Sequence, residues 1–368
     1  MLKLPELRIG ELVAPVPIVQ GGMGVGISMS RLAAAVANEG GIGVLSAAMP
    51  GFMEPDVKTN MKAANIRGLR SEIRKARQMT RGLLGVNIMV ALTDYASMVE
   101  VSVDEGIDII FSGAGMPLSL PEYLPAGSKT KLAPIVSSGR AAMLICKKWQ
   151  HRYGVLPDAV VVEGPKAGGH LGFKNDELDK PEFVLEELVP QVKAALKPFE
   201  ESAGKTIPVI AAGGIYTGRD MFQIMALGAD AVQLGTRFVA THECDAEMGF
   251  KQAYIDATKD DIVVIKSPVG MPGRAIRNRF LDAARNGERT PMKCPFHCLR
   301  TCDPEKSPYC IATALANARR GKFSYGFAFA GANAWRVDKI ASVKELMAEL
   351  CQGYLAAAGC AADDQNAA

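Results

Sequence analysis

The stretch Val160-Val161-Val162-Glu163-Gly164-Pro165-Lys166-Ala167-Gly168-Gly169-His170-Leu171-Gly172 is the most informative part of this sequence. Its β-branched start predicts a short buried strand, and the glycines that follow predict a loop. Glycines let backbone N–H groups come close to a flat or anionic ligand, because no Cβ stands in the way. His170 adds a group that can exchange a proton near neutral pH. Such a strand and loop indicate a ligand site with acid–base capacity, and therefore an enzyme.

The same strand-and-loop pattern recurs along the chain. We predict strands at Pro17–Gln20, Ile42–Ser46, Leu83–Met89, Ile107–Ser112, Leu132–Val136, Ala159–Val162, Ile207–Ala211 and Ala231–Leu234. Helical patterns lie between them at Arg31–Glu39, Asp94–Glu105, Arg140–Tyr153, Lys180–Lys197 and Gly218–Leu227. This alternation predicts an α/β fold, a TIM (β/α)₈ barrel. An open doubly wound sheet is disfavoured, because Gly21-Gly22-Met23-Gly24-Val25-Gly26 lacks the spacing G-x-G-x-x-G.

The rhythm breaks after Thr241. We expect a smaller, mainly helical domain inserted after strand eight, at residues 244–331, that carries a cysteine-rich segment and serves as a substrate or lid domain. The barrel would then comprise residues 1–243 and 332–368. A last helix is predicted at about Ser342–Leu355, and the small, polar tail Ala356–Ala368 is expected to fray.

Composition limits the classes of partner. The chain has 368 residues, of which 48% are hydrophobic and 22% charged, and its formal net charge is +3. That charge is too small to indicate nucleic acid binding. No apolar run is long enough for a membrane span, and the N-terminus lacks the apolar stretch of a signal peptide. We expect a cytoplasmic protein with a small-molecule substrate and neither a nucleic acid nor a membrane partner; a homodimer is left open.

Active sites of such barrels lie where the strands end. The loops after strands seven and eight contain Gly213-Gly214 and Gly235-Thr236, which suit a phosphate group through bare backbone N–H groups. The alternative is that these glycines only make tight turns. Asn87 ends a strand and could contact the edge of a flavin ring, or it could be a turn residue. Lys166 could neutralise an anion or be a solvated lysine, and His170 could be structural.

Four cysteines, Cys294, Cys298, Cys302 and Cys310, fall close together in the predicted second domain. Their spacing matches neither a zinc knuckle nor a ferredoxin motif. Close thiols in a reducing compartment more often indicate a metal than disulfides. We expect either a ligand set for zinc or an iron–sulfur cluster, or free thiols.

The chain contains, in order, Gln20-Gly21-Gly22-Met23-Gly24, Gly85-Val86-Asn87, Ala167-Gly168-Gly169-His170, Ala211-Ala212-Gly213-Gly214 and Gln233-Leu234-Gly235-Thr236-Arg237. Together these motifs resemble the nitronate monooxygenase family, whose superfamily also contains FMN-dependent enoyl-acyl-carrier-protein reductases and NAD(P)H:quinone reductases. The resemblance implies a TIM barrel that binds FMN non-covalently. It assigns to the cofactor Gly22, Met23, Gly24, Asn87, Glu163, Lys166, Gly169, Gly213, Gly214, Gln233, Gly235 and Thr236, and to catalysis His170.

The resemblance implies oxidation of alkyl nitronates with oxygen, with one electron passing to FMN and His170 orienting or deprotonating the substrate. The alternatives are reduction of enoyl thioesters or quinones with NAD(P)H as co-substrate, and a non-catalytic flavin or metal redox sensor. Two features depart from the family. Many relatives carry Gln where Glu163 stands, and the best-characterised members lack the four-cysteine segment.

Overall fold

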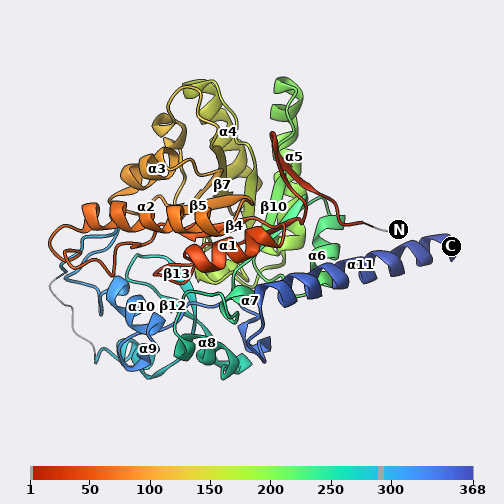
Figure 1. Ribbon diagram of the computed structural model, residues 1–368. Coiled ribbons are helices and arrows are strands. Elements are labelled where there is room, and N and C mark those ends of the chain that lie inside the picture. The colour runs from red at the N-terminus through yellow and green to blue at the C-terminus, as the bar shows by residue number, and fades with distance from the viewer. Residues whose placement is uncertain (1–2, 289–293, 368) are drawn as a thin grey trace.

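The computed structural model describes residues 3–288 and 294–367 (Figure 1). Its centre is an eight-stranded parallel sheet with the strand order β3-β11-β10-β8-β7-β6-β5-β4. A bridge between Val19 and Ile42 joins the two edge strands, so the sheet is a nearly closed barrel. The strands are β3 (Ile18–Gln20), β4 (Gly43–Ser46), β5 (Leu84–Met89), β6 (Ile109–Gly113), β7 (Lys131–Val136), β8 (Val160–Glu163), β10 (Val209–Ala212) and β11 (Ala231–Leu234). The prediction of an α/β barrel with these strands is confirmed.

Helices cover the outside of the barrel (Figure 1). They are α1 (Ser30–Asn38), α2 (Met61–Met79), α3 (Tyr95–Asp104), α4 (Gly139–Tyr153), α5 (Leu185–Ala203), α6 (Gly218–Ala226), the short α7 (Thr236–Val239) and α11 (Val343–Ala367). Helix α4 shows why such segments fold locally. The Ser138 side chain accepts a hydrogen bond from the Ala141 backbone N–H at its start, and Gly154 ends it in a left-handed conformation.

The last helix corrects one prediction. Helix α11 continues to Ala367, so the expectation that the tail frays from Ala356 onward is wrong. The tail is rich in alanine, which has the highest helix propensity, and small polar residues do not by themselves end a helix. Ala368 lies outside the described residues. Nearer its start, α11 packs so closely on α6 that a Cβ on Gly218 would stand 2.2 Å from the Leu350 carbonyl oxygen.

The interior of the barrel is closed at its N-terminal end by a hairpin that the sequence did not reveal. Strands β1 (Leu7–Ile9) and β2 (Leu12–Ala14) pair antiparallel. Leu7 and Ile9 are each 1% exposed and pack with side chains inside the barrel, among them Phe111 and Val161. The hairpin therefore fills the end of the barrel that lies opposite the strand-following loops.

The segment after strand eight forms a group of elements at one end of the molecule (Figure 1). It contains α8 (Met248–Ile255), β12 (Ile262–Lys266), β13 (Pro272–Ile276), α9 (Arg279–Arg285) and α10 (Ile311–Arg319). Strand β13 pairs antiparallel with both β12 and β9 (Gly169–His170), so a small sheet joins this segment to the loop after β8. The limits 244–331 stay a prediction. Within the described residues, no helix combines the length and apolarity that crossing a membrane requires.

We expect Leu7→Ala to lower the free energy of unfolding by about 2–5 kcal/mol, because it leaves a cavity under the barrel. Leu227→Ala is the matched control, since Leu227 is 43% exposed at the end of α6. Urea denaturation followed by circular dichroism measures both. Equal effects of the two substitutions would show that the hairpin does not seal the barrel.

Candidate active site

A cavity of about 280 Å³ lies at the carboxyl ends of the barrel strands. Every candidate residue named for the cofactor and for catalysis lines it: Gly22, Met23, Gly24, Asn87, Glu163, Lys166, Gly169, His170, Gly213, Gly214, Gln233, Gly235 and Thr236. They come together because all parallel strands of a barrel present their carboxyl ends on the same side. The structure thus brings the predicted residues to one place, while the role of each remains a prediction.

One wall of the cavity is backbone. A Cβ on Gly22 would stand 2.4 Å from the Asn87 Cβ, so only glycine lets this loop lie against the end of β5. Buried Gln20 holds the loop in place. Its side chain accepts a hydrogen bond from the Val44 N–H (3.0 Å) and donates one to Ser28 Oγ (2.9 Å). Ser28 Oγ in turn accepts from the Met23 N–H (3.0 Å), so the glycine loop has a fixed shape.

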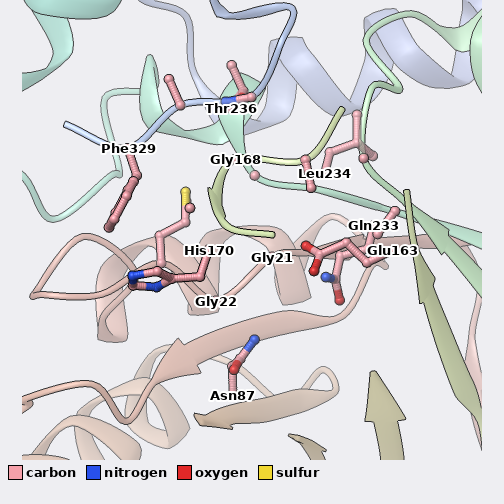
Figure 2. Close-up of a pocket in the computed structure, with 18 of the residues that line it drawn as sticks. Gly21, Gly22, Asn87, Glu163, Gly168, His170, Gln233, Leu234, Thr236 and Phe329 are labelled. Atoms are coloured by element: carbon pink, nitrogen blue, oxygen red, sulfur yellow. The ribbon is translucent and has the colours of Figure 1, made fainter. Parts of the chain in front are cut away.

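Three polar side chains face the cavity without a protein partner. Figure 2 shows Glu163 and Gln233 side by side on one side of the cavity, and Asn87 below it on β5. Within the described residues, none of these three side chains makes a hydrogen bond. Buried polar groups normally have partners, so these amides and this carboxyl are available to the polar edge of a ligand.

The phosphate-type loops have the expected backbone. Gly213 and Gly214 have φ angles of +95° and +91°, a region that other residues rarely adopt. In the described chain, their N–H groups and that of Gly235 donate no backbone hydrogen bond. The Thr236 Oγ1 atom accepts from the Gly331 N–H at 3.1 Å. These free N–H groups could bind an anionic group.

His170 lies across the cavity from Glu163, next to Phe329 (Figure 2). Its Nε2 atom is 2.7 Å from Ser267 Oγ, and its ring meets the Phe329 ring edge-on with centroids 4.9 Å apart. Burial lowers the pKa of His170 to about 4, so the imidazole is neutral at pH 7. A neutral imidazole offers one N–H donor and one basic nitrogen.

Arg274 is a candidate positioning residue that the sequence analysis does not identify. It is 9% exposed, and its guanidinium donates to the backbone carbonyl oxygens of Pro165 and Ala167 (2.7 Å for the latter). Its strand also pairs with Gly169 and His170. Arg274 therefore fixes the loop that carries His170. A buried arginine in a short strand leaves no periodic pattern in the sequence, so only the structure identifies Arg274.

The four cysteines of the candidate ligand set, with His297, line one small cavity beside α10. They are free thiols, and burial raises the pKa of Cys298 to about 12. Across residues 3–288 and 294–367, no three His, Cys, Asp or Glu side chains stand close enough together to hold a metal ion. The structure therefore gathers the cysteines but does not support the zinc prediction.

Glu163 gives the cavity a pH dependence. Burial raises its pKa from 4.5 to about 7, so the folded chain binds more protons than the unfolded chain between these values. Stability then falls as the pH rises through this window. In ligand-free protein, we expect wild type to lose up to about 3 kcal/mol relative to Glu163→Gln from about pH 5 to pH 8.

Urea denaturation at several pH values measures this difference. The control is Glu182→Gln, which changes an exposed glutamate and should leave the pH dependence of wild type intact. A difference between wild type and Glu163→Gln that stays constant with pH would mean that Glu163 titrates normally.

The chain is similar to known proteins both in sequence and in fold. The sequence profile of the nitronate monooxygenase family matches residues 8–353. One relative is the Mycobacterium tuberculosis protein named (3aS,4S,5R,7aS)-5-hydroxy-7a-methyl-1-oxo-octahydro-1H-indene-4-carboxyl-CoA dehydrogenase, to which the chain is 32% identical over 276 residues. The match covers 74% of this chain and 66% of that protein, which is just under two thirds of its length. It is 29% identical over 297 residues to a probable nitronate monooxygenase of Staphylococcus aureus strain Newman, over 72% of this chain and 76% of that one.

Two solved structures share the fold. FabK from Thermotoga maritima superposes with a TM-score of 0.73 at 29% identity, over 94% of this chain and 95% of that one. A nitroalkane oxidase from Streptomyces ansochromogenes superposes with a TM-score of 0.72 at 24% identity, over 94% and 97% of the two chains. The profile covers nearly the whole chain. The chain is therefore an oxidoreductase that belongs to the nitronate monooxygenase family.

Proposed function

We propose that this protein is an FMN-dependent oxidoreductase that oxidises alkyl nitronates with oxygen. The observation that carries the proposal is a neutral histidine, His170, held beside a glycine-walled cavity with unpaired polar groups on its other side. The family assignment supplies the flavin and the reaction class.

The residues present fit FMN. The bare backbone at Gly22 gives a flat ring close access, and the unpaired side chains of Asn87 and Gln233 suit its polar edge. The free N–H groups of Gly213, Gly214 and Gly235 would hold the phosphate, and Lys166, whose side chain lies against Gly214, adds a positive charge nearby. When bound, FMN supplies the electron transfer, and the protein supplies position and charge.

Glu163 gives this cavity a property that a glutamine would not. With its pKa near 7, the carboxyl can stand protonated in the cavity and donate a hydrogen bond, or ionise and accept one. A glutamine can do both at once but cannot change with pH. Glu163 therefore adds a protonation state to the polar side of the pocket.

His170 would act on the substrate in one of two ways. Because the imidazole is neutral, its basic nitrogen can accept a proton from the carbon next to a nitro group. Its N–H can also orient the anionic nitronate by a hydrogen bond. Ser267 fixes the ring by its contact with Nε2, and Phe329 packs on its edge, so the histidine keeps one orientation.

A second candidate is the reduction of enoyl thioesters or quinones with NAD(P)H. Similarity to a protein named as a carboxyl-CoA dehydrogenase and to FabK favours a thioester substrate. The same histidine would then hydrogen-bond the thioester carbonyl or deliver a proton to it. The two functions differ in the electron donor, which makes them separable by experiment.

The test uses the purified holoenzyme with propionate 3-nitronate and oxygen, and separately with NADH or NADPH and crotonyl-CoA or a quinone. We expect oxygen consumption with the nitronate and at least a tenfold lower kcat/KM in His170→Ala, because one proton-handling group contributes about 10²–10⁴-fold. His151→Ala, an exposed histidine at the end of α4, is the control. Rapid NAD(P)H consumption without nitronate turnover would establish the reductase instead.

Arg274 should matter for cofactor binding although it lies behind the loop. We expect Arg274→Met to weaken FMN affinity at least tenfold, since the carbonyl groups of Pro165 and Ala167 lose their donor and the loop loosens. Quenching of FMN fluorescence on binding measures the dissociation constant. Arg277→Met, which alters an exposed arginine just after the same strand, should bind FMN like wild type. Equal affinities of the two variants would contradict the role given to Arg274.

A further inference from the structure

The cysteine-rich loop is attached to the barrel directly above one of its strands. The Thr93 N–H donates to the Cys298 carbonyl oxygen (3.1 Å), and the Arg300 N–H donates to that of Ala91 (2.9 Å). Leu92 and Leu299 form an antiparallel bridge between these two contacts. The partners follow β5, which carries Asn87, so the loop has a fixed position next to the active-site cavity.

The four thiols surround one space rather than lying scattered over the loop. Cys294, Cys298, Cys302 and Cys310 line the same small cavity, which Tyr309 and Ser307 also border. Cys298 is buried and the other three are partly exposed. Cys310 is the residue from which α10 begins.

One sulfur already accepts a hydrogen bond of the kind that thiolate ligands receive, and the Cys302 thiol donates to Ser307 Oγ, whose own hydrogen goes to the Asp303 carbonyl oxygen. His297 has a φ angle of +48°, unusual for a residue other than glycine, and this turn directs its N–H to the Cys294 Sγ at 3.4 Å. Ser307 Oγ lies 3.7 Å from the Cys302 Sγ. Hydrogen bonds to sulfur orient thiolates and tune the group that they hold.

A zinc ion and an iron–sulfur cluster differ in how far apart their four cysteine sulfurs stand. Around a single zinc ion the four sulfurs converge to 2.3 Å from the metal, so neighbours stand about 4 Å apart. Among the described residues, no three ligand groups approach one point in this way. In a [4Fe–4S] cluster each thiolate binds its own iron, and the sulfurs surround the cluster from a wider distance. The four cysteines line one small cavity, which is the placement that a cluster held by four thiolates requires.

We propose that Cys294, Cys298, Cys302 and Cys310 bind a [4Fe–4S] cluster. The His297 backbone N–H contributes a hydrogen bond to the Cys294 thiolate through the contact described above. The cluster occupies the small cavity at the start of α10.

The site is joined to the active site by packed rings. Tyr309, at the cysteine cavity, packs on Phe327 with centroids 5.7 Å apart, and Phe327 packs on Phe329 at 5.0 Å. Phe329 contacts His170 at 4.9 Å. Leu315, five residues after Cys310 and so about 7 Å further along α10, lines the active-site cavity. The cluster is thus a one-electron centre beside the active site, and its loss should disturb the pocket.

The test begins with the full chain, purified without oxygen and reconstituted with ferrous iron and sulfide. We expect about four iron and four sulfide ions per chain. We also expect a broad visible absorption that bleaches with dithionite, and an electron paramagnetic resonance signal from the reduced protein. Iron below half an equivalent after reconstitution, or one zinc ion without sulfide, would overturn the proposal.

The variants Cys302→Ser and Cys310→Ser should each lose at least half of the iron and the resonance signal. Both thiols are partly exposed, so these changes disturb the core little. Cys360→Ser is the matched control, because Cys360 is exposed on α11 and should keep the wild-type iron content. FMN content and thermal melting of each variant establish that it is folded. Equal iron in all three variants would contradict the assignment of these ligands, whatever substrate the enzyme uses.

Discussion

The antiparallel pairing between β9 and β13 is the contact on which the active site depends. It joins Gly169 and His170, just after strand six of the barrel, to Gly273 and Arg274 in the segment that follows strand eight. The same hairpin region supplies the guanidinium that holds the loop carbonyls and, through Ser267, the hydroxyl next to His170. The histidine therefore belongs to the barrel by sequence, but its position is set by residues about a hundred positions later.

The barrel strands could be predicted from sequence because both of their faces are buried. Val160–Val162 and Ile109–Phe111 are fully enclosed, and such strands read as continuous apolar runs. The site could be predicted for a related reason. Parallel strands all end on the same side, so polar and glycine residues after each run, such as Asn87 and Gly213, must share one cavity.

Other features left no local signal. Strand β9 is two residues long, and its pairing with Arg274 exists only in the folded chain. The Leu7–Ile9 strand is too short for its alternation to stand out. The end of α11 was missed because small residues at a terminus suggest fraying, whereas alanine also favours helix. The cysteine spacing indicates a ligand set, but only the structure shows that the four cysteines line one cavity.

The hairpin under the barrel also bears on how the chain folds. Leu7 and Ile9 precede all eight barrel strands in the chain, yet the apolar cluster that buries them includes Ile210 and Ala231. Contacts between such distant residues form late, because a long loop must close before they gain anything. Until the last barrel strand has been synthesised, the apolar cluster that buries the hairpin is incomplete, and the apolar side chains of the hairpin stay exposed to other chains. The element that seals the finished barrel is thus, during synthesis, an apolar surface that needs protection from aggregation.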